Sequence, residues 1–261
     1  MHPAAWVVWA TCAGMVAFST TNPLYLATIA AVSWFVYAAH HVQGPSARSF
    51  RIFFLVALVT VAVRTALVFL GTVNASNVTF AALEGMRLGV LLIVFGTFNA
   101  VTDPFGVLRL APRRFHEPAL AAALALSIAP RTIAAVGRVR EAQQLRGIRV
   151  GKWRALPALA VPVLETGMEE ALTLAESMDS RGHGRGRRSR YRPQRWSAAG
   201  VATAAAAVLA LTVFIGAAFR GLGGLAPSTD PLEWPNASPA LIGVICFLAL
   251  PGLFPLRKDT T

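Results

Sequence analysis

The chain has 261 residues, of which 55% are hydrophobic and 14% charged, and its mean hydropathy is +0.56. This composition excludes an ordinary soluble domain. Its 24 basic and 12 acidic residues give a net charge of +12. Because long apolar runs accompany that charge, the sequence predicts a membrane protein with basic cytoplasmic loops rather than a nucleic-acid-binding protein.

Apolar runs long enough to cross the hydrocarbon core recur along the chain. We expect about six spans, at Ala4–Ser19, Leu24–Ala39, Ile52–Thr72, Phe80–Ala100, Ser197–Phe219 and Ala237–Pro255. Arg64 falls near the middle of the third span, and an arginine there is costly and therefore a candidate functional residue. Glu84 and Arg87 fall in the fourth span, three residues apart, where they can satisfy each other.

The distribution of Lys and Arg predicts the orientation. Residues 103–196 hold 17 Lys and Arg against 8 Asp and Glu, and the loop 40–51 and the tail 256–261 are also basic. The loops 20–23 and 73–79 carry no Lys or Arg. We therefore expect an all-α, polytopic helical protein of the plasma membrane with both termini in the cytoplasm. Its expected parts are N-terminal membrane helices in 1–102, a cytoplasmic or interfacial helical domain in 103–196, and a terminal helix pair with its tail in 197–261.

The first elements expected in the cytoplasmic domain are a short helix and a long one. Phe105–Phe115 predicts a short interfacial helix, whose arginines suit anionic headgroups. The longer helix follows over Glu117–Gln144, and its first part, Ala119–Ala129, is apolar enough to lie partly in the membrane. We expect Pro130 to kink or break this helix and Gly147 to cap its end.

A second amphipathic helix is expected from about Val163 to Ser180, after Pro157 and Pro162. Its apolar residues fall at helical spacing on one face, and most of its acidic residues fall elsewhere. Gly182 is expected to end it.

The two amphipathic helices end in the same way. Each has a glutamate five residues before an arginine, and a glycine directly after that arginine: Glu141, Leu145, Arg146 and Gly147 in the first, and Glu176, Ser180, Arg181 and Gly182 in the second. A lone arginine here is usually only a cap, because it complements the helix dipole and the free carbonyls. Its repetition in one domain favours a docking device, since a guanidinium offers a rigid fork to a carboxylate of a partner.

The segments from Ala129–Pro130 to Arg146–Gly147 and from Val161–Pro162 to Arg181–Gly182 resemble the two coupling-helix signatures of one transporter family. This family is the transmembrane (T) component of energy-coupling factor (ECF) transporters, related to cobalt permeases. The resemblance extends over most of the chain, because apolar spans precede and follow the basic helical domain.

This resemblance implies a non-catalytic subunit of an ATP-driven importer. Two ABC-type ATPases would dock on the helix ends, and ATP binding would move the helices. A separate substrate-binding membrane subunit (S component) would then rotate and release a vitamin or transition-metal ion. The implied docking residues are Leu145, Arg146, Gly147, Ser180, Arg181 and Gly182, with Glu141, Glu176, Pro130 and Pro162 in support.

Other motifs predict less. Gly147–Lys152 is one residue short of a phosphate-binding loop, and Trp153 replaces the required Ser or Thr, so we do not expect this chain to hydrolyse ATP. No catalytic constellation, metal site or cofactor is expected. The seven arginines within 181–195 predict a basic linker at the lipid surface rather than a nucleic-acid site. A membrane-interface enzyme that acts on an anionic lipid headgroup, and a lipid-tethered scaffold, remain alternatives.

Overall fold

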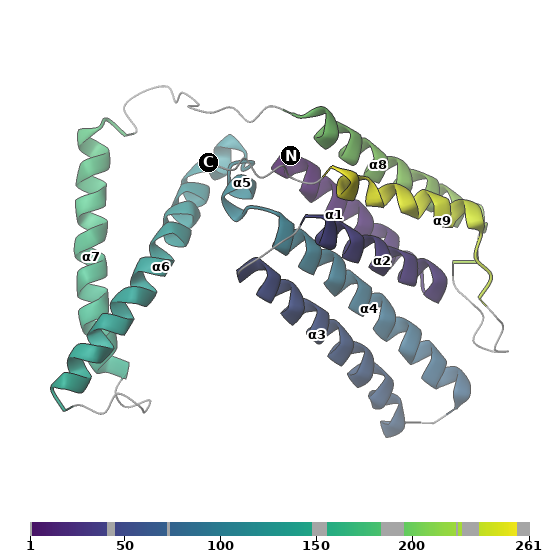
Figure 1. The fold of residues 1–261 in the computed structure, drawn as a ribbon, viewed down its shortest axis with the longest axis horizontal. Coiled ribbons are helices and arrows are strands. Elements are labelled where there is room, and N and C mark those ends of the chain that lie inside the picture. Colours follow the sequence, from purple (N-terminus) through teal and green to yellow (C-terminus); the bar gives the residue numbers. More distant parts are fainter. Residues whose placement is uncertain are drawn as a thin grey trace. The chain divides into compact units, whose positions relative to one another are not determined.

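The structure is a computed structural model that describes residues 2–40, 45–71, 74–147, 156–183, 196–222, 224–225 and 235–254. These residues form helices and no strand. The helices are α1 (Pro3–Phe18), α2 (Pro23–Ala39), α3 (Pro45–Ala66), η1 (Leu67–Leu70), α4 (Ala75–Val101), α5 (Pro104–Leu108), η2 (Arg113–Phe115), α6 (His116–Leu145), α7 (Leu156–Ser180), α8 (Ala198–Phe219), α9 (Pro239–Cys246) and η4 (Phe247–Leu253). The expected all-α class is confirmed (Figure 1).

The chain divides into two compact units. One comprises Met1–Leu110 with Gln194–Thr261, and we call it the membrane unit. The other comprises Ala111–Pro193, and we call it the helix-pair unit because α6 and α7 lie in it.

Several helices are apolar enough to lie in a membrane, which makes the chain a multi-pass membrane protein. Among the described residues, four also have the length to cross it: Ser46–Leu70, Ala75–Val101, Glu117–Leu145 and Ala198–Phe219. Shorter apolar helices are Pro3–Phe18, Pro23–Ala39 and Pro239–Leu253. Each of the expected spans coincides with one of these helices, although Thr72 and Pro255 lie outside the described residues. The remaining long helix is α6, which meets the requirement because its first half is nearly free of charge.

Several helices of the membrane unit begin at a polar residue followed by proline. Asn22 precedes Pro23 at the start of α2, and its side chain accepts a hydrogen bond from the amide of Leu24. Asp103 precedes Pro104 and accepts from the first amides of α5 in the same way. Such a side chain satisfies an amide that has no partner within the helix, while proline at the first helical position gives up an amide that would be unpaired.

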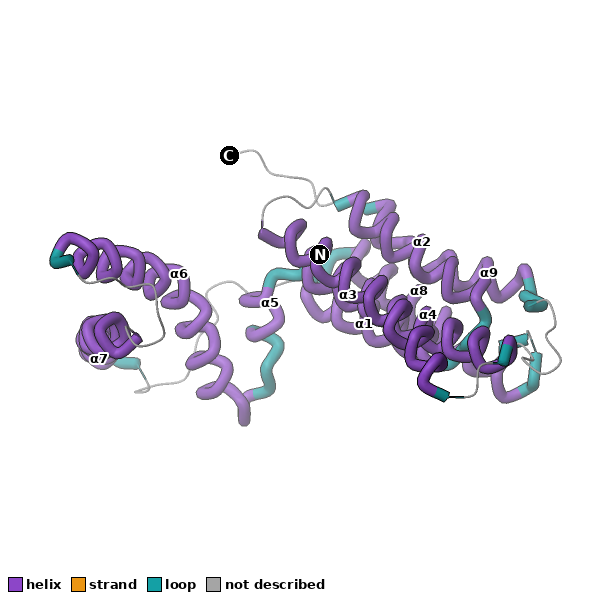
Figure 2. The backbone as a smooth tube through the Cα atoms, turned by 90° about the horizontal axis from the view of Figure 1, so that it is seen from below, coloured by secondary structure: helices purple, strands orange, loops and turns teal. Residues whose placement is uncertain are grey.

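The core of the membrane unit lies between α1, α2, α4, α8 and α9, which run side by side (Figures 1 and 2). Trp9 on α1 is buried, and its Nε1 donates to the carbonyl of Leu248 at 2.8 Å. Tyr25 on α2 meets Phe214 on α8 edge to face, with ring centroids 5.6 Å apart. These buried aromatic side chains with satisfied polar atoms connect the first helix pair to the last one.

The α3 helix packs on α4 through glycines. A Cβ atom placed on Gly85 would lie 3.1 Å from the Cα of Val61, and one on Gly96 would lie 2.7 Å from the Cβ of Phe53. Small residues at such positions let two membrane helices approach closely. The opposite face of α3 is exposed along its length, with Leu55 and Leu58 more than half exposed.

Two loops that are far apart in sequence are held together by Asn22. This side chain is fully buried, and its Nδ2 donates to the carbonyl of Gly224 at 2.7 Å and to that of Asn236 at 3.0 Å. The backbone amide of Asn22 donates to the carbonyl of Leu225. The turn between α1 and α2 therefore fixes the described ends of the connection between α8 and α9. Nothing in the sequence pattern predicted this contact.

The helix expected over Phe105–Phe115 is wrong as a single element. The structure has α5 over Pro104–Leu108 and η2 over Arg113–Phe115, with non-helical residues between them. The reason lies in Pro112, because a residue before proline is disfavoured in the α conformation.

Prolines do not break the helices of the helix-pair unit. The α6 helix is continuous from His116 to Leu145 and bends along its course in Figure 2, so it is not broken at Pro130. Its ring is on the exposed side of the helix, where the carbonyl four residues back can tilt outward. The second helix begins at Leu156 instead of about Val163. Pro157 falls in its first turn, where the missing amide costs nothing.

Candidate functional site

The end of α6 is capped as the sequence predicted. Arg146 is the C-cap residue, and Gly147 follows with φ of +77°, in the left-handed region that favours glycine. The amide of Gly147 donates to the carbonyl of Gln144 at 3.0 Å, and the amide of Arg146 donates to that of Ala142. The backbone of the cap thus satisfies the last carbonyls without the arginine side chain.

The end of α7 has a complete Schellman motif. Gly182 has φ of +76° and its amide donates to the carbonyl of Asp179 at 2.8 Å. The amide of His183 donates to the carbonyl of Met178 at 2.9 Å. Arg181 sits at the C-cap, as Arg146 does in α6. The two helix ends therefore share one backbone geometry as well as one sequence pattern.

Both arginine side chains are exposed and available. Within the described residues, neither the Arg146 nor the Arg181 guanidinium makes a hydrogen bond or an ion pair. Glu141 and Glu176 are exposed too, and the structure pairs neither with its arginine. Leu145 beside Arg146 is 91% exposed, which is unusual for a leucine and leaves an apolar side chain next to the cation.

The two arginines lie at opposite ends of the helix-pair unit. α6 and α7 contact each other where α6 ends and α7 begins, and the chain then runs back along α7 (Figure 1). With 25 residues at about 1.5 Å each, α7 is about 37 Å long. Arg146 and Arg181 are therefore too far apart to bind one side chain of a partner, and they form two separate points of contact.

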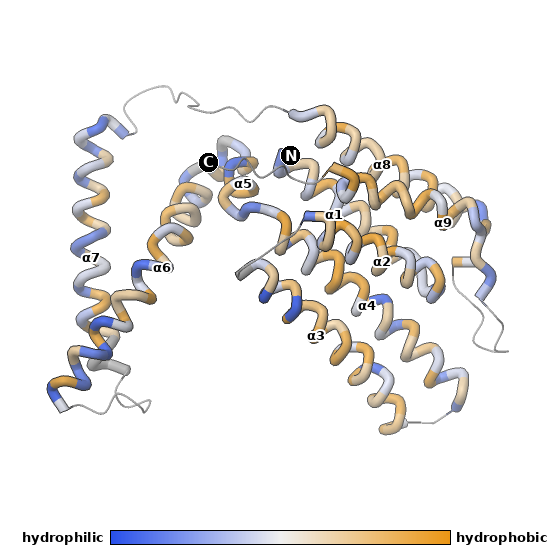
Figure 3. The backbone as a smooth tube through the Cα atoms, in the orientation of Figure 1, coloured by the Kyte–Doolittle hydropathy of each residue, from blue (hydrophilic) through white to orange (hydrophobic). Residues whose placement is uncertain are grey.

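The α6 and α7 helices differ in charge. The apolar residues of α6 gather in its first half, and its second half carries Arg131, Arg138 and Arg140 (Figure 3). By contrast, α7 contains no Lys or Arg. It carries acidic residues beside an exposed apolar stripe, formed by Val161, Leu164, Met168 and Leu172. The α7 helix therefore lacks the basic polar face of helices that bind anionic membrane surfaces.

A third Arg–Gly helix end, which the sequence reasoning missed, lies in the membrane unit. Arg220 is the C-cap of α8, and Gly221 follows with φ of +64°. The amide of Leu222 donates to the carbonyl of Ala217 at 3.0 Å, as in a Schellman motif. The Arg220–Gly221 dipeptide directly follows the apolar run of α8 and could have been found in the sequence. Its presence shows that the backbone geometry alone is a general way to end a helix, and that Arg146 and Arg181 are distinguished by their amphipathic helices and preceding glutamates.

Two groups of charges lie in the membrane unit. Arg87 pairs with Glu84 at 3.3 Å and its guanidinium lies over the ring of Phe18, 4.9 Å from the centroid. The expected Glu84–Arg87 pair is thereby confirmed. Arg64 has no ion pair or hydrogen bond in the part of the chain that is described. It lies in the last turn of α3, six residues before the end of the apolar stretch Ser46–Leu70 rather than near its middle.

The described ranges contain no group of three or more His, Cys, Asp or Glu side chains that could hold a metal ion. Cys12 is buried and Cys246 is exposed, and both are free thiols. Gly151 and Trp153 of the incomplete phosphate-loop pattern, the arginines from 185 to 195 and the basic tail lie outside the described residues.

No protein-family model matches the chain, and no curated protein shows significant similarity to it.

Proposed function

We propose that the chain is the energy-coupling membrane subunit of an ECF-type ABC importer. In this role two ATPase subunits dock on the ends of α6 and α7, one at Arg146 and one at Arg181. Their ATP-driven closure moves the helix-pair unit, and the membrane unit passes the motion to an S component that binds a vitamin or transition-metal ion. The chain itself carries out no catalysis and takes no cofactor.

One observation supports the proposal: two exposed arginines precede left-handed glycines at opposite ends of one helix pair. At both helix ends the glycine amide donates to a carbonyl of the last turn. The guanidinium groups are therefore not needed as caps and remain free for a carboxylate. If such a pair becomes buried on docking, breaking it by truncating one partner costs about 2–5 kcal/mol.

The composition of the two helices supports separate roles along them. The apolar first half of α6 suits the membrane, and its arginine-bearing second half suits the cytoplasmic surface. The acidic and apolar α7 suits contact with protein subunits. We assign the helix-pair unit to the cytoplasm because the segment 103–196, which contains it, holds 17 Lys and Arg.

Affinity purification from the native membrane tests this function. Tagged wild-type protein is expected to bring ABC-type ATPases and a small membrane subunit with it in mild detergent. The double variant Arg146→Glu, Arg181→Glu is expected to lose the ATPases, because each new carboxylate meets an acidic residue on the partner. Arg220→Glu is the matched control, since it reverses the charge of an arginine in the same cap geometry on α8.

The comparison of these variants discriminates between the alternatives. Loss of ATPases in the double variant but not in Arg220→Glu supports docking at the helix pair. A stoichiometric ATPase complex in the double variant would refute it. A wild-type protein that purifies alone and turns over an anionic phospholipid would instead favour the membrane-interface enzyme.

A further inference from the structure

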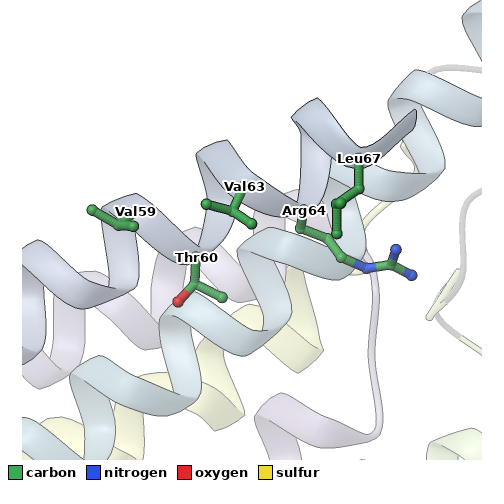
Figure 4. A pocket seen from close by; sticks show the side chains of 5 residues that line it. All are labelled: Val59, Thr60, Val63, Arg64 and Leu67. Carbon is green, nitrogen blue, oxygen red and sulfur yellow. The ribbon is translucent and has the colours of Figure 1, made fainter. Parts of the chain in front are cut away.

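Arg64 occupies a position from which its charge can reach the membrane surface. It lies in the last turn of α3, and the 3-10 helix η1 follows directly after Ala66. Figure 4 shows its side chain extending along the helix, so that the guanidinium passes Leu67 and points away from Val59. Long basic side chains near the ends of membrane helices direct their charge to the interface in this way. The cation also complements the negative end of the helix dipole.

A shallow apolar groove begins beside this arginine. Its volume is about 240 Å³. It is lined by Val59, Thr60, Val63, Arg64 and Leu67, all from the face of α3 shown in Figure 4. Exposed apolar side chains continue along the helix toward its start, with Leu55 62% exposed. The groove borders the contact with α4, since a Cβ atom placed on Gly85 would lie 3.2 Å from the Cβ of Arg64, while Val59, Val63 and Leu67 are exposed.

We propose that this groove binds one anionic phospholipid. The phosphate lies on the guanidinium of Arg64, and an acyl chain runs along Val63, Thr60 and Val59 toward the middle of the membrane. From Arg64 to Leu55 the helix rises about 14 Å, and half of the hydrocarbon core measures about 15 Å. Because the apolar helical stretch continues to Leu70, the guanidinium reaches the headgroups by extending along the helix, and the apolar side chains lie at the depth of the acyl chain. This inference does not depend on the proposed transport function.

The structure favours a lipid over a neighbouring protein helix as the occupant. Arg87, which lies within α4, has Glu84 and the Phe18 ring as partners within the chain. Arg64 has no such partner among the described residues, and its charge lies at the helix end, where lipid phosphates are concentrated. The groove follows a single helix between short β-branched side chains. Such a groove accommodates an extended acyl chain better than a second helix, which is about 10 Å across.

Lipid retention on the full chain tests the site. The protein is reconstituted in phosphatidylcholine bilayers that contain a minority of phosphatidylglycerol, released into mild detergent, and weighed by native mass spectrometry. We expect wild-type protein to retain phosphatidylglycerol in preference to phosphatidylcholine. We expect Arg64→Leu to weaken this preference about fivefold, the factor that corresponds to about 1 kcal/mol for one arginine at an anionic surface.

Further variants separate charge from shape and from folding. Arg64→Lys is expected to keep most of the preference, whereas Thr60→Trp fills the groove and is expected to remove it without changing any charge. Arg51→Leu, at the opposite and exposed end of α3, is expected to behave as wild type. Glycerol phosphate, which has the headgroup without the chains, is expected not to compete with the bound lipid.

Three results would overturn the proposal. The first is wild-type protein that retains both lipids equally. The second is Arg64→Leu with undiminished retention of phosphatidylglycerol. The third is a membrane protein that co-purifies with wild type, is lost from Arg64→Leu, and displaces the lipid, which would assign the groove to a protein partner.

Discussion

Replacing Asn22 with alanine should destabilise the membrane unit more than any other single polar truncation suggested by its hydrogen bonds. The change removes the N-cap of α2, worth about 1 kcal/mol. It also leaves the carbonyls of Gly224 and Asn236 without a donor in a buried site, at about 1 kcal/mol or more each. We therefore expect the free energy of unfolding to fall by about 3 kcal/mol, which corresponds to a fall of about 6–12 °C in apparent Tm for a chain of this size.

Thermal unfolding in detergent, followed by tryptophan fluorescence, measures this loss. Thr11→Ala is the control, because the exposed Thr11 hydroxyl donates only to the carbonyl of Val7 in its own helix. Asn22→Ser keeps a capping oxygen and should fall between Asn22→Ala and wild type. Hydrogen exchange should also accelerate at residues 224–225 in Asn22→Ala. Equal melting of Asn22→Ala and Thr11→Ala would show that the buried contact contributes little.

Three further variants probe other features of the fold. Gly96→Ala should lower the free energy of unfolding by about 1–3 kcal/mol, since its Cβ would lie 2.7 Å from that of Phe53. Gly216→Ala is the control and should leave the free energy of unfolding unchanged, because no atom would lie within 4 Å of its Cβ. Gly182→Ala should speed amide exchange over residues 180–183, because a left-handed alanine costs about 1–2 kcal/mol; unchanged exchange would contradict the role of that cap. Burial lowers the pKa of His40, which follows the end of α2, although its hydrogen bond to the Val36 carbonyl opposes this. The folded state then binds fewer protons than the unfolded chain just below pH 6.5, so apparent Tm should fall on acidification, and His40→Gln should flatten that dependence.

Much of the fold follows from local features of the sequence. Long apolar runs predicted where helices lie, because the length needed to cross a membrane is read from residues close in sequence. The left-handed glycines at 147 and 182 were predicted for the same reason. Local rules were less reliable at proline, where the outcome depends on position: Pro157 falls in a first turn and Pro130 faces outward.

Contacts between distant segments were not predictable from the sequence. The Asn22 contact joins residues more than 200 positions apart, and a buried asparagine looks in sequence like any turn residue. The packing of Gly85 on Val61 likewise depends on which helices become neighbours. In the candidate site, the sequence pattern predicted that α6 and α7 each end in an arginine. The distance between Arg146 and Arg181 depends on the direction that α7 takes, which residue spacing does not predict.

The separation of Arg146 and Arg181 has a consequence for how an assembly would come apart. Under the proposed function the chain is a bivalent ligand, with one anchor at each end of a rod about 37 Å long. When one ATPase leaves its anchor, its contact with the second, still anchored ATPase holds it at a high effective concentration, so rebinding is fast. Single charge reversals should then shorten the lifetime of the complex only moderately, and the double reversal should shorten it by far more than either single change suggests.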